Sequence, residues 1–356
     1  METKKHYANI KITKLKNSEI EITGEISAER LATCKTEALK KITKNAEMDG
    51  FRKGHVPSSV VSAKIGEAGL LEEASEIALA EEYPKIVIDH KLDVISRPEI
   101  SITKMAFGNP LEFKIKTTVM PEIKLADYKK IAKGIMAKEE STEVTEKEIE
   151  AVILEIRRNA VHAKHHKDNP NDTKHNHPEI KDEDLPPFDE AFVKTLGEFK
   201  DIADLKEKIK ENLIKEKEYK NSDKKRIAMA DEMVKKSTID MPEIIVQSEL
   251  AKMLAQFKDD ITRAGLTYED YLKHIKKSEE DIKKEWRPDA EKKGAVQLIL
   301  NKIAVEEKLE ADSETLKKET EALMKMYKEA DPERVKIYVE TMLLNEKVFK
   351  FLEEQK

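Results

Sequence analysis

The sequence contains little of what builds a cross-linked or β-rich protein. Its 356 residues include one cysteine, ten glycines and twelve prolines, and only 5% are aromatic. One cysteine excludes both an internal disulfide and a cysteine-based metal site. Few aromatic residues together with 39% charged residues favour long helices with solvated faces over a β-sandwich or barrel. The length predicts two or three domains, and the charge content predicts an extended molecule with much exposed surface.

Long apolar runs are also absent. No apolar stretch reaches the ~18 residues of a membrane span, and the first residues, Met-Glu-Thr-Lys-Lys-His-Tyr, lack the apolar segment of a secretion signal. We therefore expect a soluble, cytoplasmic protein. The lone Cys34 falls in a helical apolar stripe with Leu31, Ala38 and Ile42, which indicates a core residue and not a nucleophile.

Charge is unevenly distributed along the chain. The formal net charge is −6, yet residues 1–60 hold twelve Lys and Arg against eight Asp and Glu. A basic end on an acidic protein favours a local anionic partner such as RNA. The alternative is an ordinary solvated face in a lysine-rich chain.

The first 120 residues combine the period of strands with the period of helices. The predicted elements are strands around residues 10–12, 20–22, 100–102 and 111–119, and helices over 27–45 and 58–83. Ser27 is expected to start the first helix. The order ββααββ predicts a small α+β domain that ends near Met120.

The pattern changes after Pro121. An extended connector is expected first, then a helix over 145–166, and then a polar linker over 167–187 without either period. From Phe188 onward the apolar spacing predicts several long helices, and Pro288 is expected to kink or break one of them. We predict an α+β N-terminal domain followed by a mainly α-helical, elongated C-terminal domain. The predicted domains are residues 1–120, 121–187 and 188–356.

The sharpest local feature is the loop Gly50-Phe51-Arg52-Lys53-Gly54-His55-Val56-Pro57. Two glycines and a proline in eight residues predict a tight loop between two helices. An aromatic ring beside two cations suits RNA phosphate together with a shallow apolar protein pocket. The alternative is a plain turn with a buried phenylalanine.

This loop resembles the ribosome-binding signature of the trigger factor family, and it follows two strands and a helix as it does in that family. Further resemblances follow in order along the chain. They are Val94–Ile100, Pro121–Leu125 with Asp127 and Tyr128, Phe188–Phe192, and Ile239–Pro242.

The resemblance implies an ATP-independent chaperone without cofactors. Such a protein docks on the large ribosomal subunit beside the exit tunnel, touching a ribosomal protein and adjacent rRNA, and shields nascent chains during folding and export. A weak homodimer of the free protein is also implied. Carried over by position, Phe51, Arg52 and Lys53 are the ribosome contacts, while Gly50, Gly54 and Pro57 shape the loop. His55 stands where the family often has Lys or Arg.

One departure from the family concerns catalysis. Trigger factors usually insert a prolyl isomerase domain of the FKBP type, but here only residues 163–187 occupy that place. This stretch is too short and too polar to build a sheet with an apolar proline pocket. No glycine-rich phosphate loop, G-x-S-x-G or H-E-x-x-H motif is present either. We therefore expect no isomerase activity and no other enzyme activity.

Two residue types invite further hypotheses. Several histidines near the linker could share a divalent metal; the alternative is a polar linker that replaced a lost domain. They are His162, His165, His166, His175 and His177. Methionines of the helical part could form an adaptable client-binding surface or fill gaps in the core. The candidates are Met229, Met233, Met253, Met324, Met326 and Met342.

Three alternative functions remain open at this point. A ribosome-bound assembly or hibernation factor would keep the loop but would need no exposed apolar surface. An envelope chaperone would need the secretion signal that is not seen. A metal-dependent role would depend on the histidines.

Overall fold

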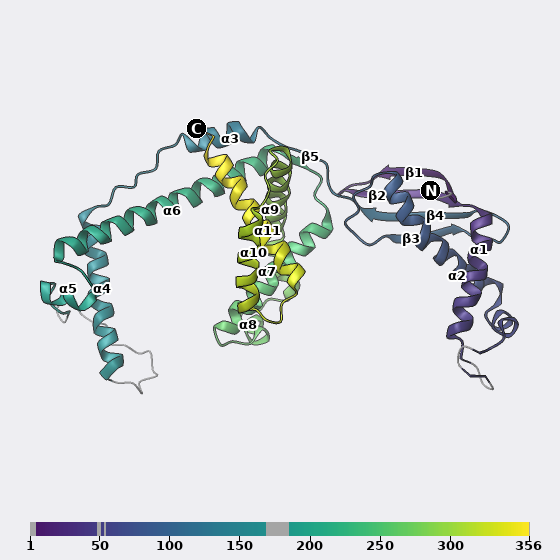
Figure 1. Ribbon diagram of the computed structural model, residues 1–356, viewed down its shortest axis with the longest axis horizontal. Coiled ribbons are helices and arrows are strands. Elements are labelled where there is room, and N and C mark those ends of the chain that lie inside the picture. The colour runs from purple at the N-terminus through teal and green to yellow at the C-terminus, as the bar shows by residue number, and fades with distance from the viewer. Residues whose placement is uncertain (1–4, 48–50, 53–54, 169–184, 356) are drawn as a thin grey trace. The chain divides into compact units, whose positions relative to one another are not determined.

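The protein was examined as a computed structural model, which describes residues 5–47, 51–52, 55–168 and 185–355, without the side chains of 164–168. The chain forms two compact units, and each unit combines segments that are distant in sequence. Unit 1 consists of Met1–Ala126 and Val234–Leu309, and unit 2 of Asp127–Met233 and Glu310–Lys356. Figure 1 labels the helices and strands of both.

Unit 1 begins with a four-stranded antiparallel sheet. Its strands are β1 (Tyr7–Lys14), β2 (Glu19–Ile26), β3 (Glu99–Lys104) and β4 (Leu111–Thr118), in the order β1-β2-β4-β3. The alternation on β2 and β4 buries every second side chain, and Ile22 stands opposite Ile115. The four predicted strands are thus confirmed.

Two helices cover the buried face of this sheet (Figure 1). Helix α1 (Ala28–Asn45) begins where predicted, and the Ser27 hydroxyl accepts a hydrogen bond from the Arg30 N–H. Helix α2 (Ser58–Asp89) runs past Pro84, further than expected, and bends at Gly66, whose φ is +77°. Glycine adopts this angle without the penalty that a side chain would bring.

The rest of unit 1 comes from later in the chain. Strand β5 (Ile123–Lys124) pairs with β6 (Thr238–Ile239), which leads to α7 (Glu243–Arg263), α8 (Tyr268–Ile275) and α9 (Glu279–Glu306). Pro288, expected to kink or break a helix, does not break α9, which continues through it. Trp286 and Ala290, on either side of the proline, both pack on α7. This packing offsets the hydrogen bond that proline cannot make.

Unit 2 is helical. It contains α3 (Tyr128–Met136), α4 (Glu146–Asp168), α5 (Glu190–Leu196), most of α6 (Ile202–Lys236), α10 (Ser313–Met326) and α11 (Pro332–Glu353). An apolar cluster joins α4, α5 and the first half of α6 around Val193, Ile153 and Ile209. Arg157 of α4 donates to the carbonyl oxygens of Pro186 at 2.8 Å and Leu185 at 3.4 Å. An α+β part at the N-terminus followed by helices is therefore confirmed.

The described part of the chain contains no helix with the length and apolar character needed to cross a bilayer.

Candidate functional site

The loop between α1 and α2 presents an exposed aromatic ring next to a cation. Phe51 is 43% exposed, and it is the only one of the nine phenylalanines that is classed as exposed. Arg52 is exposed as well, and its carbonyl oxygen accepts a hydrogen bond from the His55 N–H at 2.9 Å. The Phe51 ring and the Arg52 side chain are therefore both available for contact with a partner.

The same loop is fixed where it joins α2. Val56 is buried, and the Pro57 carbonyl oxygen accepts the first helical hydrogen bonds, from Val60 at 3.0 Å and Val61 at 3.1 Å. Gly50, Lys53 and Gly54 lie outside the described residues. Phe51 and Arg52 therefore lie between the end of α1 and the turn at Val56 and Pro57 that starts α2, in the loop that the motif predicts.

Ion pairs hold the two helices that carry the loop. Arg30 of α1 bonds to Glu81 of α2 and, at 3.3 Å, to Glu37, while Lys41 bonds to Glu73 at 2.5 Å. The hydrogen bond to Glu73 raises the pKa of Lys41 above its usual value, so the lysine stays charged. The Arg30–Glu81 pair joins the two helices at the end remote from the loop, and the Lys41–Glu73 pair joins them nearer to it.

Cys34 lies inside this helical pair and is fully buried. Burial raises the pKa of its thiol to about 11, against a smaller opposing effect of Arg30. The thiol is therefore protonated at neutral pH, and its interpretation as a core residue is confirmed.

A second exposed apolar surface lies on the α10–α11 hairpin of unit 2. Met326 and Tyr327 end α10, at 73% and 55% exposure, and residues of the first turns of α11 are similarly open. We call this set the hairpin surface: Met326, Tyr327, Ile337, Tyr338 and Met342. Single exposed apolar residues are common, but several on one pair of helices form a candidate interaction surface.

The six candidate methionines do not share one environment. Met229 and Met233 are buried in α6, and Met253 and Met324 are half-buried. Met326 and Met342 are exposed. The two buried side chains fill the interior because α6 is packed at that point, so they offer no surface in this structure.

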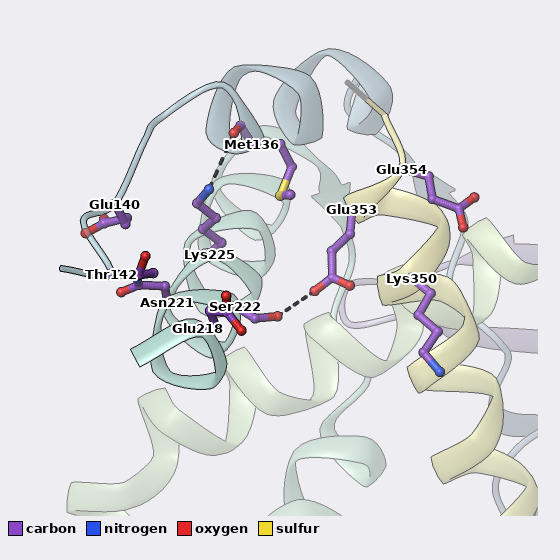
Figure 2. Close-up of a pocket in the computed structure, with 10 residues that line it drawn as sticks. All are labelled: Met136, Glu140, Thr142, Glu218, Asn221, Ser222, Lys225, Lys350, Glu353 and Glu354. Atoms are coloured by element: carbon purple, nitrogen blue, oxygen red, sulfur yellow. Dashed lines mark hydrogen bonds between the residues drawn. The ribbon is translucent and has the colours of Figure 1, made fainter. Parts of the chain in front are cut away.

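A cavity of about 500 Å³ lies in unit 2 between α3, α6 and the end of α11 (Figure 2). Lys225 reaches the carbonyl oxygen of Met136 at 3.4 Å, and the Ser222 hydroxyl donates to Glu353 at 2.8 Å. Glu140 also pairs with Lys224 of α6 at 2.8 Å, so polar bonds between these elements line the cavity.

The histidines are only partly described. His162 lies on α4, whereas the side chains of His165 and His166 and all of His175 and His177 are outside the described residues. Within the described ranges, no group of three or more His, Cys, Asp or Glu side chains could hold a metal ion. Metal binding by the histidines stays a hypothesis.

Comparison with known proteins decides the family. A model described as "Bacterial trigger factor protein (TF)" matches residues 8–156, and one described as "Bacterial trigger factor protein (TF) C-terminus" matches residues 201–356. The chain belongs to the bacterial trigger factor family. The resemblance drawn from its loop motif is thereby confirmed, and its function is that of a trigger factor chaperone.

Full-length relatives agree with this membership. The trigger factor of Halalkalibacterium halodurans is 25% identical over 399 positions, covering 91% of this chain and 92% of the relative. That of Bacillus pumilus is 27% identical over 393 positions, covering 90% and 92%. Both alignments are longer than the 356 residues of this chain, so these trigger factors contain sequence that it lacks.

A solved trigger factor structure shares the fold. It is described as "Promiscuous Substrate Recognition in Folding and Assembly Activities of the Trigger Factor Chaperone" and aligns with a TM-score of 0.59 at 16% identity, covering 98% of this chain and all of that one.

Sequence reasoning missed the apolar residues of the hairpin surface other than its methionines. Tyr327, Ile337 and Tyr338 read in sequence as ordinary core positions of amphipathic helices. In the structure α10 packs on α11, and these three side chains lie outside the contact between the two helices and are exposed.

Proposed function

We propose that this trigger factor chaperone docks on the large ribosomal subunit through its 50–57 loop and holds apolar segments of nascent chains on the hairpin surface, without a nucleotide. The contacts at the exit tunnel are a ribosomal protein and adjacent rRNA. Ribosome docking is supported by one observation in particular: Phe51 and Arg52 are both exposed in the loop between α1 and α2.

The chemistry of the loop supports this docking. The guanidinium of Arg52 suits phosphate oxygens, and the Lys53 ammonium adds a second charge that attracts RNA. The Phe51 ring adds an apolar contact for a protein pocket, and its burial would remove exposed apolar area from water. Gly50, Gly54 and Pro57 are the proposed loop-shaping residues.

Ribosome co-sedimentation tests the docking loop. The triple variant Phe51→Ala, Arg52→Ala, Lys53→Ala is expected to stay in the supernatant when the unaltered protein pellets. A matched control is Ile100→Ala, Lys104→Ala, Lys116→Ala. It also removes one exposed apolar residue, 44% exposed, and two cations, but from the sheet. Equal pelleting of both triple variants would contradict the docking role.

The hairpin surface supports the client-binding half. Apolar contacts stabilise a complex by roughly 25 cal/mol per Å² of buried area, and confining an unfolded chain opposes this gain. A client that folds withdraws its own apolar side chains, so release needs no nucleotide. Met326 and Met342, with adaptable thioether side chains, suit clients of unrelated sequence.

Suppression of aggregation of an unfolded test protein examines this surface. Replacing Ile337, Tyr338 and Met342 with serine is expected to weaken the suppression without changing ribosome binding. The control is Ile88→Ser with Val305→Ser, which removes two exposed apolar side chains of unit 1, at 72% and 74% exposure. If the hairpin variant protects as well as the control, an assembly or hibernation factor becomes the better account.

The absence of isomerase activity also belongs to the proposal. Residues 157–200 lie between the two matched segments, and within them Arg157 ties α4 directly to Leu185 and Pro186. The proposed functional segments are 1–120 for docking, 121–187 for connection and 188–356 for client binding. A standard proline isomerisation assay on a short peptide is expected to show no acceleration. A cytoplasmic location and a weak homodimer of the free protein complete the proposal.

A further inference from the structure

A two-residue segment, Pro121 and Glu122, connects the sheet of unit 1 to β5 and the helices that follow. We call this segment the bridge. The chain leaves the sheet at Met120, whose N–H donates to the Asp93 carbonyl oxygen at 2.8 Å, and enters β5 at Ile123. Rotation about the backbone bonds of this bridge would change the orientation of the sheet relative to α7 and α9, unless a second connection restrains it.

A second connection is present at the turn between β1 and β2. The Asp240 carboxylate accepts hydrogen bonds from the N–H groups of Asn17 at 3.0 Å and Ser18 at 2.6 Å. The Ser18 hydroxyl donates in return to the Asp240 carbonyl oxygen at 2.5 Å. Asn17 and Ser18 have φ angles of +59° and +56°. Two successive residues of this hand direct their N–H groups toward one anion.

Apolar packing at this junction is incomplete, although Pro121 of the bridge is buried. A cavity of about 180 Å³ lies at the junction, bordered by Leu15, Ser18, Val119, Met120 and Asp240. Leu15 and Met120 are 37% and 42% exposed. An incompletely filled junction loses dispersion contacts, so its orientation depends more on directional hydrogen bonds.

We propose that Asp240 is a latch that locks the β1–β2 turn to the start of α7 and makes unit 1 a single rigid body. Its position supports this role, because Asp240 stands between β6 and α7 and is separated from Ser18 by 222 residues of sequence. The exposed ion pair of Lys14 with Glu122, at 2.6 Å, also joins β1 to the bridge. We expect the hydrogen bonds of Asp240, together with the bridge, to remove the rotation that the bridge alone would allow. The helical pair that carries the 50–57 loop is then held at one orientation to α7 and α9.

Distance measurements between spin labels test the latch. Ser101→Cys on β3 and Lys293→Cys on α9 are exposed sites, and the native Cys34 is buried and is expected not to take the label. The protein with Asp240 is expected to give one narrow distance distribution. Asp240→Ala should broaden it, and Asp240→Asn, which keeps one acceptor oxygen, should broaden it less.

Hydrogen exchange supplies the second readout. In Asp240→Ala the amides of Asn17 and Ser18 should exchange about tenfold faster or more, as expected when bonds to a charged acceptor are lost. Asp259→Ala, an exposed aspartate of α7, is the matched control and should change neither measurement. A distribution that is already broad with Asp240 present would overturn the proposal. So would an unchanged narrow distribution in Asp240→Ala despite faster exchange at both amides.

Discussion

Arg226 joins α6 to α11 within unit 2 through four hydrogen bonds. Its guanidinium donates to the carboxylate oxygens of Glu346 at 2.7 and 3.1 Å and of Glu353 at 2.6 and 3.2 Å. The Ser222 hydroxyl bonds to the same Glu353, and the Phe349 ring lies 5.5 Å from the guanidinium carbon. Replacing Arg226 with methionine keeps an unbranched, though shorter, apolar stem and leaves two carboxylates without their cation.

The expected loss of stability follows from burial. The side chains of Arg226 and Glu353 are 22% exposed and that of Glu346 is 43% exposed. A hydrogen bond to a charged group contributes roughly 1.5–3 kcal/mol, whereas an exposed ion pair contributes ~0–1 kcal/mol. For this intermediate case we expect Arg226→Met to lower the unfolding free energy of unit 2 by about 2 kcal/mol at pH 7. Arg226→Lys, which keeps the charge without the planar fork, should lose less.

The loss should depend on pH in one direction. The hydrogen bond from Arg226 lowers the pKa of Glu346 below its usual value of 4.5. For Glu353 burial acts the other way, but the bonds from Arg226 and Ser222 outweigh it and its pKa is also lowered. A lowered pKa stabilises the fold above the unfolded value and loses this effect as the pH falls through the folded value. The difference between wild type and variant should therefore hold from pH 7 down to the unfolded pKa and shrink below it.

Urea unfolding at several pH values measures this difference. Circular dichroism follows the helices of both units, while the single Trp286 reports on unit 1 alone. The variant should shift the dichroism transition of unit 2 and leave the fluorescence midpoint unchanged. Equal midpoints at pH 7, or a difference that stays constant to pH 3, would refute the reasoning.

Three further predictions concern the sheet and its helices. Gly24→Ala places a Cβ against Ile10 and 2.9 Å from a ring atom of Phe113, so it should cost about 1–3 kcal/mol, read as a lower urea midpoint of unit 1. Ser27→Ala removes the cap of α1 and should cost about 1 kcal/mol in the same assay; no change would mean that the cap is dispensable. Cys34, buried and with its pKa raised, should resist alkylation in the folded protein and react once unfolded; rapid native labelling would contradict its place in the core.

Local patterns predicted much of the fold from the sequence. Ser27 marked the start of α1 because a cap acts within one turn, and the alternation around Ile22 marked β2 because a half-buried strand repeats every two residues. Helix α3 and the pairing of β5 with β6 were missed. Two-residue strands that are more than a hundred positions apart carry no local period, and only the folded chain brings Ile123 beside Ile239.

The loop of the candidate site could be predicted from the sequence, but the exposure of the candidate methionines could not. The loop could be placed from its glycines and proline, which specify a turn locally, and Phe51 and Arg52 lie exposed there. Exposure of a methionine depends on what packs beside it. Met229 and Met326 both stand on helices, yet one is buried and the other is 73% exposed, and the helical period alone does not predict this difference.

The proposed function needs both the 50–57 loop and the hairpin surface. A protein docked on the ribosome by its loop should bind the emerging chain on its hairpin surface. A photoreactive phenylalanine analogue at position 338, added to ribosomes stalled with an unfolded nascent chain, tests this most directly. We predict a crosslink to the nascent chain that disappears when Phe51, Arg52 and Lys53 are replaced with alanine. A crosslink that survives the loop variant, or none in a protein that pellets with the ribosomes, would contradict the account.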